Sequence, residues 1–84
     1  MALPDETALR LLANRKIEAG ALPRAAPECA FAGKGVGLPC SLCEQPITED
    51  EYEFEYATGG GEARRFHLHC QEVWRLVLVQ RHCA

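Results

Sequence analysis

Two closely spaced pairs of metal-binding residues constrain this chain more than any other feature of its sequence. Cys40 and Cys43 are separated by two residues, as are His67 and Cys70, and residues 44–66 lie between the pairs. A Cys-x-x-Cys turn lets two thiolates point at one ion, and a His and a Cys three residues apart project from one face at the start of a helix. Zinc takes four such nitrogen and sulfur ligands, and structural zinc sites are closed sets such as Cys3His. The sequence therefore predicts one structural Zn2+ held by Cys40, Cys43, His67 and Cys70.

The number of cysteines also bears on the redox state of the thiols and on the cellular compartment in which the protein is expected. Five cysteines in 84 residues are an odd number, so a complete disulfide framework would leave one thiol unpaired. The first twenty residues are interrupted by charged side chains and lack the apolar stretch of a secretory signal. The longest strongly apolar run, at 76–79, is far too short to cross a membrane. We therefore expect a cytoplasmic protein with reduced thiols and no membrane association.

Other interpretations of the same residues stay open at this stage. Cys40 and Cys43 are compatible with a thioredoxin-like redox pair, although no strand–helix–strand unit surrounds them. All four positions are also compatible with ordinary buried side chains that bind no metal. His69 adjoins Cys70 and is an alternative ligand, although the spacing favours His67. Two further cysteines have no assigned role, Cys29 and Cys83.

The middle of the chain predicts a β-hairpin preceded by an irregular connection. Aromatic and acidic residues alternate over 51–56, the period of a half-buried strand. The three glycines at 59–61 predict a turn, and residues 63–67 predict the return strand. Residues 21–39 are dense in Pro and Gly and predict an extended, irregular connection. Two apolar side chains of this connection are expected against the core, Leu22 and Phe31.

The register of the hairpin follows from the position of its turn. A turn centred on Gly60 pairs Phe54 with Phe66 and Glu55 with Arg65, and both are favourable cross-strand pairs. Neighbouring positions of the first strand then fall on opposite faces of the sheet. Its acidic side chains then form a solvated face on an exposed strand edge that a partner can extend, namely Glu51, Glu53 and Glu55.

Two segments show the spacing of amphipathic helices. Residues 5–19 place their apolar side chains on one face, with Asp5 able to cap the start and Gly20 able to end the helix. A second helix is predicted from Leu68 to about Arg81, and it is apolar on two sides. We expect the hairpin to cover the first side and the amino-terminal helix to cover the second. The first side holds Cys70, Val73, Trp74 and Val77, and the second holds Leu68, Leu76, Val79 and Cys83.

The order of a Cys-x-x-Cys turn, a hairpin and a His-x-x-Cys that opens a helix resembles a treble-clef zinc finger. In particular, residues 38–81 are similar to the first zinc-binding half of a LIM domain, although this chain lacks the second half. The Gly-rich approach, Pro46-Ile47 and Trp74 also look like small bacterial proteins with the same cysteine pattern. The resemblance implies a treble-clef-like zinc-binding module, which we place at 38–84. With the amino-terminal helix and Gly/Pro-rich connection predicted at 1–37, which we expect to pack on this module, the chain is expected to form a small α+β zinc-binding domain. The resemblance also implies the same four ligands, Cys40, Cys43, His67 and Cys70.

Net charge and ligand number narrow the classes of function. The net charge of −3 and the pI near 5.5 argue against autonomous nucleic-acid binding, for which a domain pI above about 9 is usual. Four protein ligands leave no open position for a substrate water, so we expect no catalysis. We therefore expect a small intracellular, non-enzymatic module that binds another protein and is itself a monomer or a weak homodimer. The alternatives are a nucleic-acid-binding or transcription-associated zinc finger and a thiol-based redox sensor.

Overall fold

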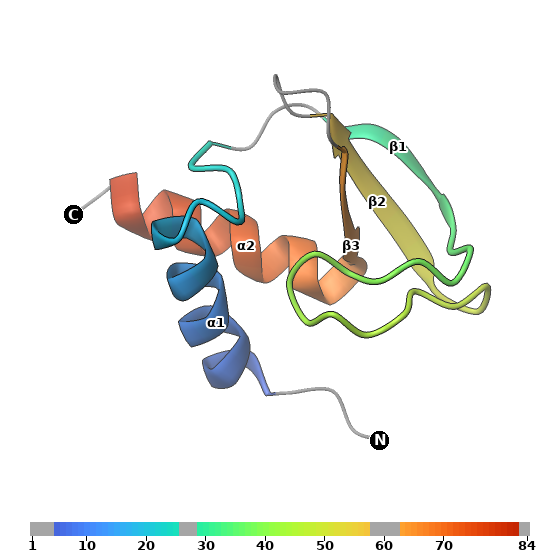
Figure 1. Ribbon diagram of the computed structural model, residues 1–84, viewed down its shortest axis with the longest axis horizontal. Coiled ribbons are helices and arrows are strands. Elements are labelled where there is room, and N and C mark those ends of the chain that lie inside the picture. The colour runs from blue at the N-terminus through green and yellow to red at the C-terminus, as the bar shows by residue number, and fades with distance from the viewer. Residues whose placement is uncertain (1–4, 26–28, 58–62, 83–84) are drawn as a thin grey trace.

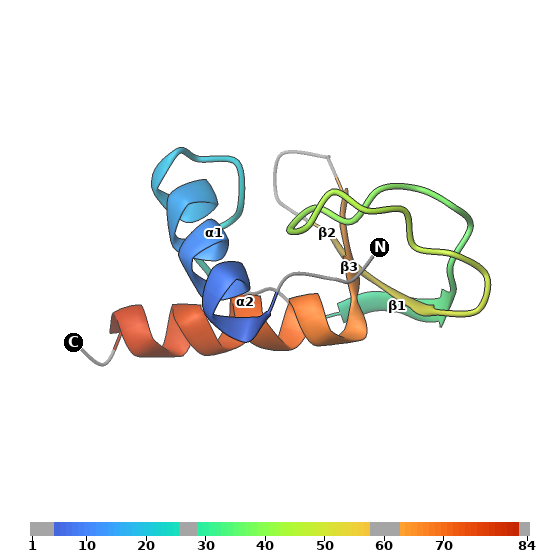
Figure 2. The same ribbon diagram turned by 90° about the horizontal axis from the view of Figure 1, so that it is seen from below.

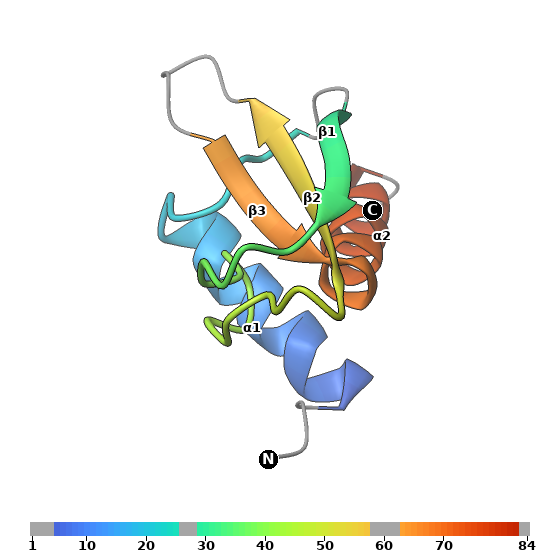
Figure 3. The ribbon, with the colours of Figure 1, turned by 90° about the vertical axis from the view of Figure 1, so that its right-hand side faces the viewer.

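The computed structural model describes residues 5–25, 29–57 and 63–82. Its elements follow the order α1 (Glu6–Glu18), β1 (Cys29–Lys34), β2 (Tyr52–Ala57), β3 (Ala63–His67) and α2 (Leu68–His82). The three strands form one antiparallel sheet in the order β1-β2-β3, which Figure 3 shows with the strands side by side. In Figure 1, α2 extends from the end of β3, and α1 crosses α2 to one side of the sheet. The protein is a small α+β structure, as the sequence predicts.

Helix α1 begins and ends at the residues that the sequence indicates. The side chain of Asp5 accepts a hydrogen bond from the backbone amide of Ala8 at 2.8 Å, which satisfies one of the free amides of the first turn. Gly20, just beyond the last turn, has a φ of +79°, a left-handed conformation that glycine adopts without strain. The predicted apolar face is buried at three positions, Leu9, Ala13 and Ile17.

The hairpin of β2 and β3 has the predicted register. Phe54 lies opposite Phe66 and Glu55 lies opposite Arg65. Arg65 Nη2 lies 3.2 Å from Glu55 Oε1, so the predicted cross-strand ion pair is present. The predicted turn at 59–61 lies outside the described residues.

Strand β1 corrects the prediction of an irregular connection between 21 and 39. Residues 29–34 form a strand that pairs with β2, and Phe31 lies opposite Glu55. The sequence of β1, CAFAGK, contains one strongly strand-favouring residue, so the pairing with β2 rather than local propensity determines its conformation. Because β1 and β3 flank β2, the acidic residues of β2 do not lie on an exposed strand edge, and that prediction is wrong.

The two faces of the sheet are also buried differently from the prediction. Glu53, expected in a solvated face, is only 5% exposed, whereas Phe31, expected against the core, is 52% exposed. Glu53 lies in the central strand between Gly33 and His67, and its Oε2 lies 3.8 Å from Arg65 Nε. Leu22 is buried, as predicted.

The core is centred on three aromatic rings. Trp74 of α2 stacks on Phe66 of β3 with ring centroids 4.7 Å apart, and Tyr56 of β2 meets both rings edge-on. The polar atoms of these rings have partners, because the Tyr56 hydroxyl donates to Gln71 Oε1 at 2.6 Å and Trp74 Nε1–H donates to the carbonyl of Pro23 at 3.3 Å. These contacts hold α2 against one face of the sheet.

Helix α1 does not cover the side of α2 that the sequence assigns to it. The side of α2 toward the sheet is buried as predicted, but Leu76 and Val79 are exposed. Arg81 Nη1 instead donates to Asn14 Oδ1 at 2.6 Å, which ties the last turn of α2 to α1. The thirteen-residue helix α1 packs instead on the side of α2 that already faces the core. Its buried side chains thereby join those of α2 and the sheet in one continuous core.

Gly35 is expected to tolerate no side chain. A Cβ at this position would collide with the backbone carbonyls of Ile47 and Thr48, which have little freedom to move. Gly35→Ala should therefore lower the free energy of unfolding by about 1–3 kcal/mol, measured by urea denaturation. Gly33→Ala is the control, since its Cβ would meet only the end of the exposed Phe31 ring, and a change within about 0.5 kcal/mol is expected. Equal effects of the two variants would contradict this packing.

Candidate metal centre

Two segments of the chain supply the predicted ligand residues, the cysteine turn and the continuous junction of β3 and α2. Cys40 and Cys43 lie in the turn that follows β1, His67 is the last residue of β3, and Cys70 lies in the first turn of α2. The turn is attached to β3 through Ser41, whose amide donates to the carbonyl of Arg65 at 2.7 Å and whose hydroxyl accepts from the Arg65 amide at 3.1 Å. This pairing brings the two cysteine sulfurs beside the junction of β3 and α2.

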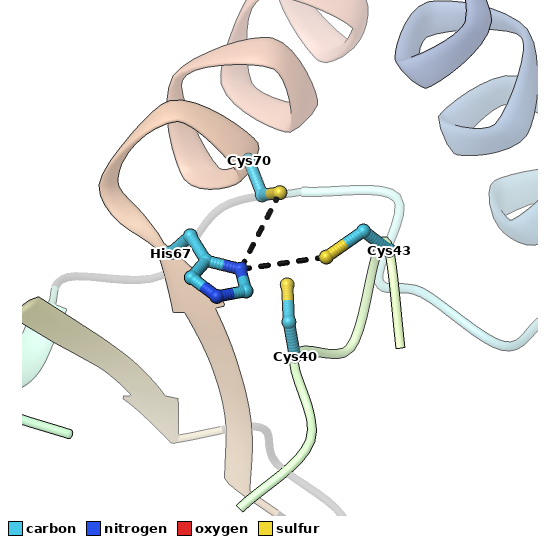
Figure 4. A group of neighbouring side chains, drawn as sticks. All are labelled: Cys40, Cys43, His67 and Cys70. Atoms are coloured by element: carbon cyan, nitrogen blue, oxygen red, sulfur yellow. Dashed lines mark hydrogen bonds between the residues drawn. The ribbon is translucent and has the colours of Figure 1, made fainter. Parts of the chain in front are cut away.

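The structure brings all four of these side chains into one buried group. Their ligand atoms lie within 4.8 Å of one another, and every member is buried. Figure 4 shows the three sulfurs and the His67 ring pointing toward a common centre, with His67 Nδ1 3.4 Å from Cys43 Sγ and 3.8 Å from Cys70 Sγ. His69 is exposed and is not part of the group. The geometry therefore favours His67 over His69.

The surroundings of His67 fix which ring nitrogen faces the group. Nε2 lies 3.3 Å from the carbonyl oxygen of Pro46 and 3.5 Å from Glu51 Oε1. Because a carbonyl oxygen only accepts, Nε2 carries the proton and Nδ1 presents its lone pair to the sulfurs. Glu51 is held in turn by the backbone amide and the hydroxyl of Thr48, each at 3.1 Å. Such a carboxylate and carbonyl pair behind a histidine is typical of metal sites.

The three sulfurs differ in their tendency to ionise. A hydrogen bond from the Cys70 thiol, together with backbone amides including that of Leu42 at 3.4 Å, lowers the pKa of Cys40 to about 4. The same hydrogen bond and burial raise the pKa of Cys70, and burial raises the pKa of Cys43. The folded, metal-free group therefore holds one thiolate and two thiols near neutral pH.

Lys16 of α1 is a contact of the cysteine turn that the sequence analysis missed. Its Nζ donates to the carbonyls of Ser41 and Leu42, both at 2.9 Å, and lies 3.4 Å from the carboxylate of Glu44. Glu44 itself has a φ of 66°, so the turn contains a left-handed residue. Nothing in the spacing of α1 distinguishes Lys16 from a solvated lysine, because its partners lie about 25 residues along the chain.

Replacing Lys16 with methionine is expected to weaken metal binding about 10-fold, because the turn loses the ammonium group that holds two of its carbonyls. Methionine keeps the apolar stem, so the packing of α1 is retained. A competition titration with a chromophoric chelator measures the affinity. Arg15→Met, at the exposed neighbouring position, is the matched control and should change the affinity less than ~2-fold. Equal losses in both variants would show that Lys16 does not hold the turn.

The donor set suits a soft divalent metal ion. Three sulfurs and one imidazole nitrogen are the ligands that zinc prefers in structural sites, and their burial together leaves the polar atoms no solvent partner. Within residues 5–25, 29–57 and 63–82, it is the one group of at least three His, Cys, Asp or Glu side chains close enough to share an ion. The side chains of Cys29, His82 and Cys83 lie outside the described part of the structure.

The chain was compared with family models, curated proteins and solved structures, and none of them matches it. The resemblance to a treble clef and to half of a LIM domain therefore rests on the four-residue pattern and the order of the elements. Neither of the two described helices is long and apolar enough to span a membrane.

Proposed function

We propose that this protein is a small, non-catalytic module that is built around one structural zinc ion and acts by binding another protein. Cys40, Cys43, His67 and Cys70 are the proposed ligands. The observation that carries the proposal is the assembly of these four residues into one buried group from two segments of the chain, the cysteine turn and the junction of β3 and α2. A treble-clef arrangement fits the order of turn, hairpin and helix, with β1 and α1 as additions to it.

A structural role fits this group better than a catalytic role. Four ligands complete the tetrahedron that zinc prefers, whereas catalytic sites keep one position open for water. Zinc at this site would join the cysteine turn to both β3 and α2. Structural zinc contributes apparent binding free energies on the order of 10–16 kcal/mol, which is comparable to the whole stability of a small domain.

The surface and charge support a protein partner over a nucleic acid. Three thiolates and one Zn2+ would take the net charge from −3 to about −4, which is unfavourable near phosphates. Apolar side chains are exposed on α2, including Leu68, Leu76 and Val79. Such a surface replaces the acidic strand edge as the proposed contact region, because β2 lies in the centre of the sheet.

Removal of the metal separates a structural site from a catalytic one. Chelation of the zinc-loaded protein should unfold it, seen as a red shift of the emission of Trp74, the one tryptophan of the chain, and as loss of near-ultraviolet circular dichroism. Addition of zinc should restore both signals. A metal-free protein with unchanged spectra would contradict the structural role. Retention on a random DNA duplex that collapses as salt rises would instead place the protein among nucleic-acid-binding modules.

A further inference from the structure

The outer side of α2 carries a stripe of side chains that no described element covers. Leu68, Glu72, Arg75, Leu76 and Val79 recur at helical spacing, and all five are exposed. Leu68 is 49% and Val79 57% exposed, which is high for apolar side chains of a helix that packs on a sheet. Figure 2 shows α2 along one border of the molecule, at the bottom of the view, with α1 lying above it. The stripe is therefore accessible along most of the helix.

A groove adjoins the amino-terminal end of this stripe. It has a volume of about 370 Å³ and shares Leu68 and Glu72 with the stripe. The exposed ring of Tyr52 also lines it, together with His67 and His69, and Glu51 and Glu72 contribute two acidic side chains to the lining. An occupant that combines an apolar side chain with a basic one would match the groove.

The carboxy-terminal half of α2 has the complementary chemistry. Val79 supplies an apolar side chain and Arg75 supplies a positive charge one turn away from it. If two copies of α2 pack antiparallel about a two-fold axis near the middle of the helix, Leu68 of each copy faces Val79 of the other. Glu72 of each copy then faces Arg75 of the other. The stripe is thus complementary to itself under two-fold symmetry, as an isologous interface requires.

We propose that the outer face of α2 is a homodimer interface, in which a second copy of this chain packs its α2 antiparallel to the first. The second copy's Val79 contacts Tyr52 and Leu68 at the groove, and its Arg75 pairs with Glu72. The homodimer rests on the proposed function in one respect, namely that the protein acts through contact with a protein. It names a second copy of this chain as that partner. One pair of fifteen-residue helices buries a surface area at the small end of the range for stable protein–protein interfaces. The dimer is therefore reversible and depends on protein concentration.

Sedimentation equilibrium of the zinc-loaded full chain, at increasing protein concentrations, tests the interface. The unmodified protein should pass from monomer to dimer. Glu72→Arg and Arg75→Glu each place like charges at both symmetric contacts and should raise the dissociation constant at least ~10-fold. An equimolar mixture of the two variants should dimerise again, because every arginine at these positions then faces a glutamate across the interface. Within each variant chain the two charges remain alike, so no effect inside one molecule produces this rescue.

Glu49→Arg is the control, since Glu49 is exposed and lies outside the groove and the stripe, and it should leave dimerisation unchanged. A chain that stays monomeric at every concentration would overturn the interface. A dimer that resists both single charge reversals, or a mixture that stays monomeric, would overturn it as well. Metal content and circular dichroism of each variant report on the zinc site separately, so failure of the dimer is distinguishable from failure of the metal site.

Discussion

Cys43→Ser is expected to abolish both metal binding and the folded state. A serine hydroxyl does not replace a thiolate as a zinc ligand, so the cysteine turn, β3 and α2 lose the ion that joins them. The loss is a large part of the ~10–16 kcal/mol that structural zinc supplies, more than a domain of this size has in reserve. Metal analysis and near-ultraviolet circular dichroism of the purified variant measure the two effects.

Cys83→Ser is the matched control for this experiment. Cys83 lies outside the described residues, and its spacing in the sequence connects it with neither ligand pair. The variant should keep its metal, and its free energy of unfolding should lie within about 0.5 kcal/mol of that of the unmodified protein. Equal losses in Cys43→Ser and Cys83→Ser would show that the wrong cysteines have been assigned to the metal.

Metal affinity is expected to rise about 1000-fold for each unit of pH just above neutrality, because zinc displaces three thiol protons. The sign follows from linkage: the metal-free chain binds more protons than the loaded one, so raising the pH favours the loaded form. If zinc is structural, the metal-free chain is unfolded, and all three thiols have their ordinary pKa near 8.5. A chelator competition repeated from about pH 7 to about pH 8 measures this slope.

A shallower slope has a specific meaning in this protein. In the folded, metal-free site the pKa of Cys40 is about 4, whereas the pKa values of Cys43 and Cys70 are raised. A site that stayed folded without metal would release two protons, and the affinity would change about 100-fold per pH unit. That result would contradict the structural role of the metal. Lys16→Met is the control, because it should lower the affinity at every pH and leave the slope unchanged.

Short-range patterns predicted the elements that surround the candidate site. The alternation in β2 and the glycine turn predicted the pairing of Phe54 with Phe66, because a hairpin's register is determined by its turn. Asp5 and Gly20 predicted the ends of α1, because capping depends on neighbouring residues. The spacing of the two ligand pairs predicted that they meet, since the hairpin between them returns the chain to its starting edge.

Contacts between distant segments were not predictable in the same way. Strand β1 has little strand propensity of its own and depends on pairing with β2. The sequence of its six residues therefore predicted an irregular connection. The pairing of β1 with β2 also places β2 in the centre of the sheet, and Glu53 of this strand is buried, contrary to the expected solvated face. Lys16 reaches the cysteine turn only because α1 crosses α2 where it does, and no local pattern specifies that crossing.

Native mass spectrometry of the full chain, purified without chelator after growth with added zinc, tests the central claim most directly. The account predicts one zinc ion per chain, retained in the folded charge-state distribution and lost together with it when a chelator is added. Well under ~0.5 equivalent of metal in a protein that is nevertheless folded would contradict the account, because a closed Cys3His site that holds the fold together binds its ion tightly.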